Sequence, residues 1–205
     1  MRMIARVVGL ALVLGMSACA AVLAATWTAS FEGGTLSLSA DEIGWKVSNT
    51  VCILEGNAHI KDTNKVAKTV LDAYADTVTV TLFSEPAGQR GSVELIKSIE
   101  FVGPVRICQT SQKAMIDEKT GEQSTVTATA DVRADDARYD GATHMACLEG
   151  NVKMTMTDPS SPFEGPVVVT GEAAAVNLDP NPGPDDFRYK VSKARLEATP
   201  KAKED

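Results

Sequence analysis

The sequence of 205 residues predicts an all-β fold, in the form of a sandwich, a roll or a barrel. From Leu36 onward, apolar residues alternate with polar ones far more often than they recur at the helical spacing. Residues that favour turns separate the alternating runs, and no internal stretch has the pattern of a long amphipathic helix. Even residues 66–76, which come nearest to that pattern, are interpreted as a strand.

Strand and turn patterns follow one another along the whole chain. The alternation is cleanest in residues 77–82, 126–132 and 152–156, and the first run is rich in the β-branched residues that suit half-buried strands. The turn signals are Pro86-Ala87-Gly88, Lys119-Thr120-Gly121, Asp158-Pro159 and Asn181-Pro182-Gly183-Pro184. We place one β-domain at residues 25–200 and a short charged tail at residues 201–205.

Residues 1–24 are predicted to be an export signal. Arg2 and Arg6 make its start positive, and residues 7–31 carry no charge. Small side chains at Val22 and Ala24 predict cleavage after Ala24. Two alternatives stay open, because the run is long enough to remain uncut as a membrane anchor and Cys19 lies in a sequence similar to a lipid-attachment site. All three outcomes place the rest of the chain outside the inner membrane, in a bacterial periplasm.

Composition and charge narrow the classes of function. The chain has 20 Lys and Arg against 27 Asp and Glu, a formal net charge of -7, which argues against nucleic-acid binding because such proteins need a cationic face. Only two histidines and four cysteines are present, which leaves little material for a metal centre or a catalytic nucleophile. The sequence therefore predicts a protein that is not an enzyme, has no metal and needs no cofactor.

Few side chains remain as candidates for chemistry, and each has a structural interpretation. The pairs Asp41-Glu42 and Asp135-Asp136 are interpreted as turn carboxylates rather than as a catalytic acid and base. Beyond the signal, Cys52, Cys108 and Cys147 lack the spacing of a metal knuckle or a redox pair, and they allow at most one disulfide. At least one of the three is expected to be a small buried hydrophobe. No nucleophile motif accompanies the two histidines, His59 and His144. The acids at 179, 185 and 186 lack the spacing of a calcium-binding loop.

An internal repeat is the strongest pattern in the sequence. Residues 40–42 (Ala-Asp-Glu) correspond to 134–136 (Ala-Asp-Asp), and the Leu-Glu-Gly-Asn unit at 54–57 recurs at 148–151, with an offset of 94 residues in both cases. A looser match joins 75–78 to 171–174 after a two-residue insertion. Glycine and asparagine both tolerate positive φ, so each Gly-Asn pair predicts a kink, a bulge or a tight bend.

The order and spacing of these units resemble the OstA/LptA family of periplasmic proteins that carry lipopolysaccharide from the inner to the outer membrane. The residues that carry the resemblance are 40–41, 54–60, 75–76, 99–105, 134–135 and 148–154. Membership would imply an open, twisted antiparallel β-jellyroll built from two repeated halves, whose apolar interior takes the acyl chains of lipid A. It would also imply stacking end to end through edge strands, with copies of itself and with inner-membrane and outer-membrane lipopolysaccharide-transport proteins. The loops at 158–166 and 179–186 lie outside the repeat and are peculiar to this chain.

The alternation predicts which side chains face the interior of such a roll. A partly open β-roll offers a concave apolar surface, and each methylene group buried there contributes ~0.8 kcal/mol. Methionines suit a surface that adapts to lipid, although the same residues could fill a dry core. The predicted lipid-binding, inward-facing residues are Leu54, Ala58, Ile60, Val78, Val80, Ile99, Phe101, Val105, Val152, Met154, Met156 and Val176.

The exposed edges of the roll are predicted near residues 34–39 at one end and 190–198 at the other. The predicted function is that of a periplasmic bridge protein that binds lipopolysaccharide through its acyl chains. The first alternative is an inner-membrane-anchored, LptC-like component of the same export system. The second is a structural or carbohydrate-binding β-protein of the cell envelope.

Overall fold

The structure is a computed structural model that describes residues 24–31, 33–46, 50–83, 96–116, 121–178 and 189–201. Within these ranges the chain forms eleven strands and no helix, so none of it forms a helix long and apolar enough to cross a membrane. The strands are β1 (Ala25–Phe31), β2 (Gly34–Ala40), β3 (Glu42–Trp45), β4 (Val51–Asn64), β5 (Thr69–Leu82), β6 (Ile96–Ile116), β7 (Gln123–Asp140), β8 (Met145–Thr157), β9 (Phe163–Asn177), β10 (Tyr189–Ser192) and β11 (Arg195–Pro200). The export signal up to residue 23, the turn at 86–88, the loop at 179–186 and the tail from 202 lie outside the described residues.

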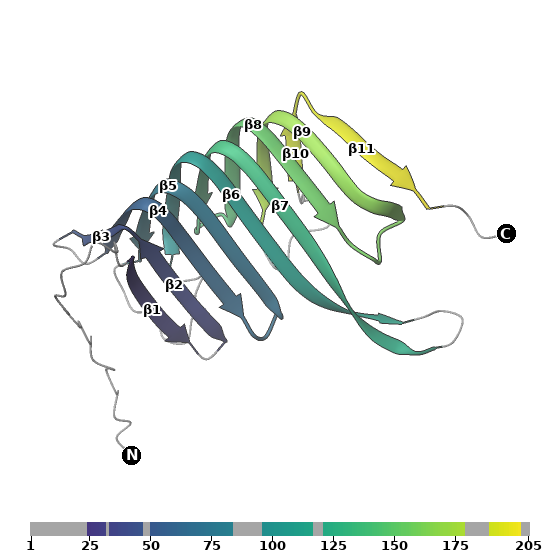
Figure 1. Ribbon diagram of the computed structural model, residues 1–205, viewed down its shortest axis with the longest axis horizontal. Helices are drawn as coiled ribbons and strands as arrows, with labels where there is room; N and C mark the ends of the chain where they lie inside the picture. The colour runs from purple at the N-terminus through teal and green to yellow at the C-terminus, as the bar shows by residue number, and fades with distance from the viewer. Residues whose placement is uncertain are drawn as a thin grey trace, which may run out of the picture.

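All eleven strands belong to one open antiparallel sheet, which confirms the predicted all-β class (Figure 1). The strand order is β1-β2-β4-β5-β6-β7-β8-β9-β10, while β3 pairs with β4 and β11 pairs with β9. Nearly every pairing therefore joins strands that are neighbours in the sequence. Figure 1 shows the strands bent over along one line, so that the sheet folds back on itself.

The bend divides the sheet into two layers that face each other. We call them the long layer and the short layer. The long layer consists of β1, β2 and β11 together with residues 58–64, 69–75, 105–116, 123–134, 152–157 and 163–171. The short layer consists of β3 and β10 together with residues 51–55, 77–82, 96–102, 136–140, 145–149 and 173–177. Each of the five long strand pairings, from β4–β5 to β8–β9, has a register shift at the boundary between the layers.

The two Gly-Asn pairs lie at these register shifts, as the repeat predicts. Gly56 and Asn57 have φ angles of +72° and +49°, and the pair at 150–151 has +71° and +47°. The Asn57 side-chain amide donates a 2.9 Å hydrogen bond to Asp41, and that of Asn151 donates one of the same length to Asp135. The acidic unit and the Gly-Asn unit of the repeat thus meet to form one corner of the bent sheet. Each repeat contains one such corner.

A third corner, which the repeat does not reveal, lies between the two. Gly103 has a φ of +92°, and a β-carbon at this position would lie 2.6 Å from Asp76 Oδ2. Asp76 is also the residue opposite the 56–57 bulge, and Glu172 is opposite the 150–151 bulge. An acidic residue and a glycine-led bulge therefore alternate from strand to strand across the bend. Bulges bend a strand and increase its twist, so a row of them at one level folds the whole sheet.

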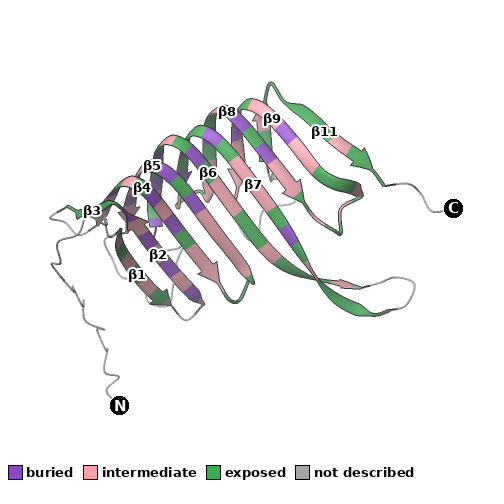
Figure 2. Ribbon diagram, viewed as in Figure 1, coloured by how far each residue is buried: buried purple, intermediate pink, exposed green. Residues whose placement is uncertain are grey.

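The core lies between the layers. Its largest fully buried side chains, with exposed fractions below 2 %, are Leu38, Leu54, Val78, Val80, Val152 and Cys52. In Figure 2 the buried positions run through the middle strands, while β11 and the tip of the β6–β7 hairpin are mostly exposed.

Two sequence-based assignments are wrong in part. Residues 34–39 are not an edge, because β2 pairs with β1 on one side and with β4 on the other. The edge strand is β1. It was not predicted because it belongs to the uncharged run of residues 7–31, which also contains most of the predicted signal. The predicted edge at 190–198 is confirmed, since β10 and β11 both lie beyond β9. In the predicted strand at 66–76, residues 66–68 form a turn and β5 begins at Thr69.

We expect Gly56→Ala to destabilise the fold by about 2–3 kcal/mol in urea denaturation. The added β-carbon would lie 3.0 Å from the Asp41 β-carbon and 2.5 Å from Oδ2, in addition to the cost of a positive φ. The control is Gly165→Ala, because Gly165 has a similar φ of +75° with no atom within 4 Å of the added carbon. That variant should lose only about 1 kcal/mol. Equal losses in the two variants would mean that the Asp41 contact does not constrain the corner.

Candidate lipid-binding interior

The candidate site is the apolar surface between the two layers. Of the twelve side chains predicted to face inward, ten are buried, and Met156 and Val176 are half-buried at the C-terminal end of the sheet. Both layers contribute, because Ile60 and Met154 belong to the long layer whereas Val78 and Phe101 belong to the short one. The structure therefore brings the whole predicted set to one interior surface.

Strand register joins these side chains into rows that cross the sheet. One row in the long layer passes through every strand of that layer, from edge to edge. Its members, each paired with the next, are Trp27, Leu38, Ile60, Ala73, Ile107, Val132, Met154, Val169 and Leu196. The matching row in the short layer is Ile43, Leu54, Val78, Phe101, Ala137, Leu148, Ala174 and Val191. Neither row contains a polar side chain.

The two ends of these rows differ. At the N-terminal end, Trp27 of β1 and Trp45 of β3 make an edge-to-face contact with ring centroids 5.6 Å apart, which connects the two layers. At the other end, Leu196 is 60 % exposed and Tyr189 is 50 % exposed, and no aromatic contact is found between β10 and β11 among the described residues. A ring pair that includes the 36 % exposed Trp45 therefore joins the layers at one end, whereas the other end has exposed Leu196 and Tyr189 without such a contact.

Several interior residues were not predicted from the sequence. They include Leu36, Leu38, Ala73, Ile96, Tyr139, Leu148 and Val169. The repeat contained a signal for two of them, since Leu148 is the counterpart of Leu54 and Tyr139 that of Trp45 at the offset of 94 residues. The interior position of the other five residues can be read only from the strand register in the structure.

The ionisable residues of the interior stay neutral. Burial raises the pKa of the Cys52 thiol to about 11, so this cysteine is the small buried hydrophobe expected of at least one of the three. Burial, together with the neighbouring Asp140 charge, also raises the pKa of Tyr139, whose hydroxyl lies 3.3 Å from His144 Nδ1. The three described cysteines are all free, with Cys108 half-buried and Cys147 exposed.

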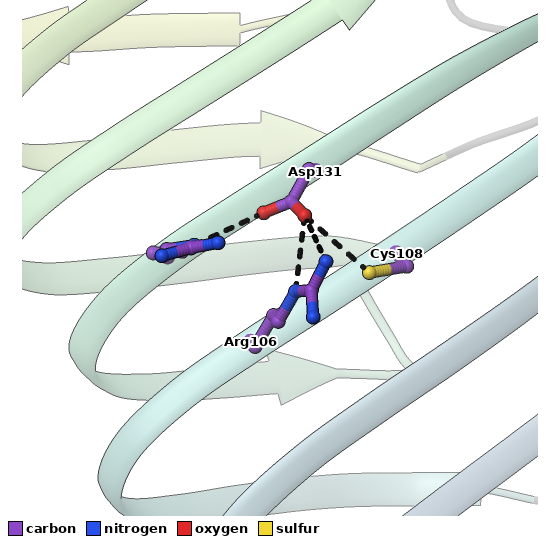
Figure 3. Close-up of polar contacts among 4 residues, drawn as sticks. Arg106, Cys108 and Asp131 are labelled. Atoms are coloured by element: carbon purple, nitrogen blue, oxygen red, sulfur yellow. Dashed lines mark hydrogen bonds and ion pairs between the residues drawn. The ribbon is translucent and has the colours of Figure 1, made fainter.

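Charged side chains are found on the outer faces instead. On the long layer, Arg106 donates two hydrogen bonds to Asp131, of 2.6 and 3.0 Å, and Arg133 donates a third (Figure 3). Partial desolvation acts to raise the pKa of Asp131, but the two guanidinium groups outweigh it and hold this pKa below its usual value. The Cys108 thiol also donates to Asp131, at 3.7 Å. This cluster links β6 to β7 from outside the interior.

The other candidates for chemistry have structural partners. Asp41 and Asp135 hold the corner asparagines. His59 contacts Asp72 at 2.8 Å, whereas His144 lies beside Tyr139 on another strand pair, so the two histidines do not share a site. Among the described residues, no three His, Cys, Asp or Glu side chains form a group that could hold a metal ion. The acids at 179, 185 and 186 lie outside those residues.

One ion pair connects the C-terminal half of the long layer to a projecting hairpin. Residues 112–116 of β6 pair with 123–127 of β7 and with no other described strand, and Figure 1 shows this hairpin extending past the rest of the sheet. Lys113 Nζ lies 2.7 Å from Asp158 Oδ2, in the predicted turn between β8 and β9. The hydrogen bond from Lys113 and then those from Ser160 lower the pKa of Asp158 to about 2.

The fold and its interior define an open β-roll with an apolar surface that runs between its two edges. No protein-family model matches the sequence, and no curated protein matches it. In fold, the chain is similar to the crystal structure of LptH from Pseudomonas aeruginosa, described as the LptA-homologous periplasmic component of the lipopolysaccharide transport device. The two are 13% identical with a TM-score of 0.48, over 80% of this chain and 95% of that one.

We expect Lys113→Gln to raise the pKa of Asp158 from about 2 toward its ordinary value of 3.8, as followed by NMR titration. A lowered carboxyl pKa stabilises the folded state above the unfolded value, and this contribution is lost as the pH falls from about 4 through 2. Lys113→Gln should therefore remove this pH-dependent contribution to the hairpin contact. Lys153→Gln, on the outer face of β8, is the control and should leave Asp158 unchanged. An unshifted Asp158 in Lys113→Gln would show that the ion pair does not form in solution.

Proposed function

We propose that this protein is a periplasmic lipid-binding protein that carries lipopolysaccharide from the inner to the outer membrane and holds its acyl chains between the two layers. The observation that carries the proposal is the pair of apolar rows that reach both edge regions of the sheet. Here the long-layer row ends on half-buried Trp27 at one edge and on exposed Leu196 at the other.

The size of the hydrophobic effect supports acyl chains as the ligand. Each methylene group moved from water into the interior contributes ~0.8 kcal/mol, so a chain of about ten methylenes contributes ~8 kcal/mol. Charge attraction is not required, which agrees with a net charge of -7 in a protein proposed to bind an anionic glycolipid. The half-buried Met156 and Val176, together with exposed Leu196, mark the C-terminal end as the side from which a chain would enter.

We also propose that the mature protein is located in the periplasm. β1 begins at Ala25, directly after the predicted cleavage position, so a mature chain that started there would keep the entire described sheet. Mass spectrometry of the mature N-terminus distinguishes a cleaved periplasmic protein from the anchored alternative, since the first starts at Ala25 and the second keeps Met1. Lipid analysis of protein purified from its native envelope distinguishes both from an envelope protein with a dry interior.

Edge strands support an end-to-end assembly. The outer side of β1, and the outer sides of β10 and β11, pair with no strand among the described residues. Unpaired N–H and C=O groups template the addition of a further strand. A second copy added there would continue the sheet and, with it, the apolar rows. We propose the same edges as the contact points for inner-membrane and outer-membrane transport proteins.

For the lipid-binding face, we expect Met156→Glu to abolish most binding of rough lipopolysaccharide while the urea midpoint stays close to that of the wild type. Met156 is half-buried and faces the interior, so the new carboxylate would lie among acyl chains, where an unpaired charge is very costly. Thr155→Glu is the matched control, because it makes the same charge change one residue away on the outer face, beside the Arg-rich Asp131 cluster. Binding should be lost only in Met156→Glu. An equal loss in both variants would refute the assignment of the interior as the lipid site.

For the assembly, we compare Thr28→Pro with Ala29→Pro in edge strand β1. Consecutive N–H groups of an edge strand point alternately toward the neighbouring strand and toward the open side. One proline therefore removes a hydrogen bond to β2 and destabilises the fold, while the other removes an outward N–H and blocks an added strand. We expect the variant that keeps the wild-type midpoint to stay monomeric in light scattering, whereas the wild type associates as its concentration rises. A wild type that stays monomeric, or a stable variant that still associates, would contradict assembly through β1.

A further inference from the structure

A hollow of about 220 Å³ opens on the outside of the bend, between β4, β5 and β6. It is lined by Asn57, Ala58, Tyr74, Ala75, Asp76 and Pro104. The two alanines are buried, whereas Tyr74 and Asp76 are exposed. The hollow exists because two neighbouring bulges, at 56–57 and 103–104, interrupt the register on either side of Asp76.

Tyr74 presents an aromatic ring that is fixed in place although it is 41 % exposed. The His59 ring stacks on it, with centroids 4.3 Å apart and planes 4° from parallel. His59 is in turn held by Asp72, whose Oδ1 lies 2.8 Å from Nε2. Partial desolvation, followed by the Asp72 charge, raises the pKa of Tyr74, and its protonated hydroxyl can donate a hydrogen bond at neutral pH. A ring held in this way loses little conformational entropy when a ligand stacks on it.

The second repeat shows that the aromatic pair is not needed to fold a corner. Asn151 and Glu172 form the counterpart of the Asn57 and Asp76 corner, with the same bulge and a nearly identical φ at the glycine. In this copy, Lys153 and Thr170 are paired in the register positions that His59 and Tyr74 occupy in the first. The first repeat therefore carries a stacked, anchored ring that its architecture does not require.

The polar groups around the ring define the chemistry of a ligand. The Asn57 amide nitrogen donates to Asp41, which leaves its side-chain oxygen as an acceptor, and the Asp76 carboxylate is a second acceptor in the lining of the hollow. Pro104 adds an apolar wall. A flat apolar face next to hydroxyl-binding acceptors matches a pyranose, which has an apolar C–H face and a rim of hydroxyl donors. The carboxylate disfavours phosphate or carboxylate groups at this position.

We infer that this hollow is a binding subsite for a single neutral pyranose ring, stacked on Tyr74 and hydrogen-bonded through its hydroxyls to Asp76 and Asn57. Its volume is below the ~300–1,000 Å³ of pockets for drug-sized ligands, so it takes one ring rather than an oligomer. The three side chains proposed to contact the ring, Tyr74, Asp76 and Asn57, are exposed and are not among the inward-facing residues, although Ala58 lines the hollow as well as the interior. The ring can come from the sugars of a glycolipid or from the glycan strands of the cell wall.

The test uses two probes, a neutral trimer of N-acetylglucosamine and a delipidated core oligosaccharide, with the full-length mature protein in calorimetry and ligand-observed NMR. Tyr74→Thr introduces the residue that the second repeat carries at the same position, so the fold is expected to survive. Loss of the stacking should weaken binding about tenfold. Asp76→Asn should weaken it similarly, whereas Tyr189→Thr removes an exposed tyrosine outside the hollow and should have no effect.

Binding of the N-acetylglucosamine trimer alone would identify wall glycan as the source of the ring, and binding of the core oligosaccharide alone would identify a glycolipid. Binding of both probes would support a subsite that recognises a pyranose ring from either source. Absence of binding by either probe at the highest attainable concentration would overturn the proposal. Binding that is unchanged in Tyr74→Thr, with the variant folded by circular dichroism, would overturn it as well. Lipid binding by the interior would be unaffected in each case.

Discussion

One repeated contact determines the shape of this protein: an acidic side chain on one strand lies directly over a glycine on the next. In the part of the chain that the structure describes, the contact occurs three times, with Asp41 over Gly56, Asp76 over Gly103 and Asp135 over Gly150. Each glycine has a positive φ, and no side chain of its own would fit beneath the carboxylate. Because these contacts lie at the same level in every second strand pairing, the sheet bends along one line.

The bend explains how a single sheet acquires an interior. Alternation gives every strand one apolar and one polar face, but a flat sheet would leave the apolar face in water. Folding along the corners brings the apolar faces of the two layers together, with Leu38 and Val152 in the long layer and Leu54 and Val78 in the short layer all almost fully buried. Since strand order nearly follows sequence order, side chains at matching levels form rows that cross the sheet. A continuous apolar surface is therefore a direct consequence of the corner geometry.

The sequence revealed the parts of this structure that are encoded locally or repeated. The alternation of apolar and polar residues predicted the all-β class and the inward-facing residues. The repeat, with its offset of 94 residues, located two of the three corners. The third was missed because Gly103 is followed by Pro104 instead of asparagine. Edge strand β1 was missed because its alternation merges with the uncharged signal. His59 and Tyr74 lie 15 positions apart, and only the pairing of β4 with β5 brings their rings into contact.

Comparison of the two repeats shows which residues the fold requires and which it does not. Both copies keep the acid, the glycine and the asparagine of the corner, and both keep large apolar residues at Leu54 and Leu148. These are the positions whose physical roles are the bend and the core. The outer positions next to the corner differ, because a stacked histidine and tyrosine in one half are replaced by lysine and threonine in the other. The inferred pyranose subsite gives this exposed, stacked ring a role that neither the bend nor the core requires.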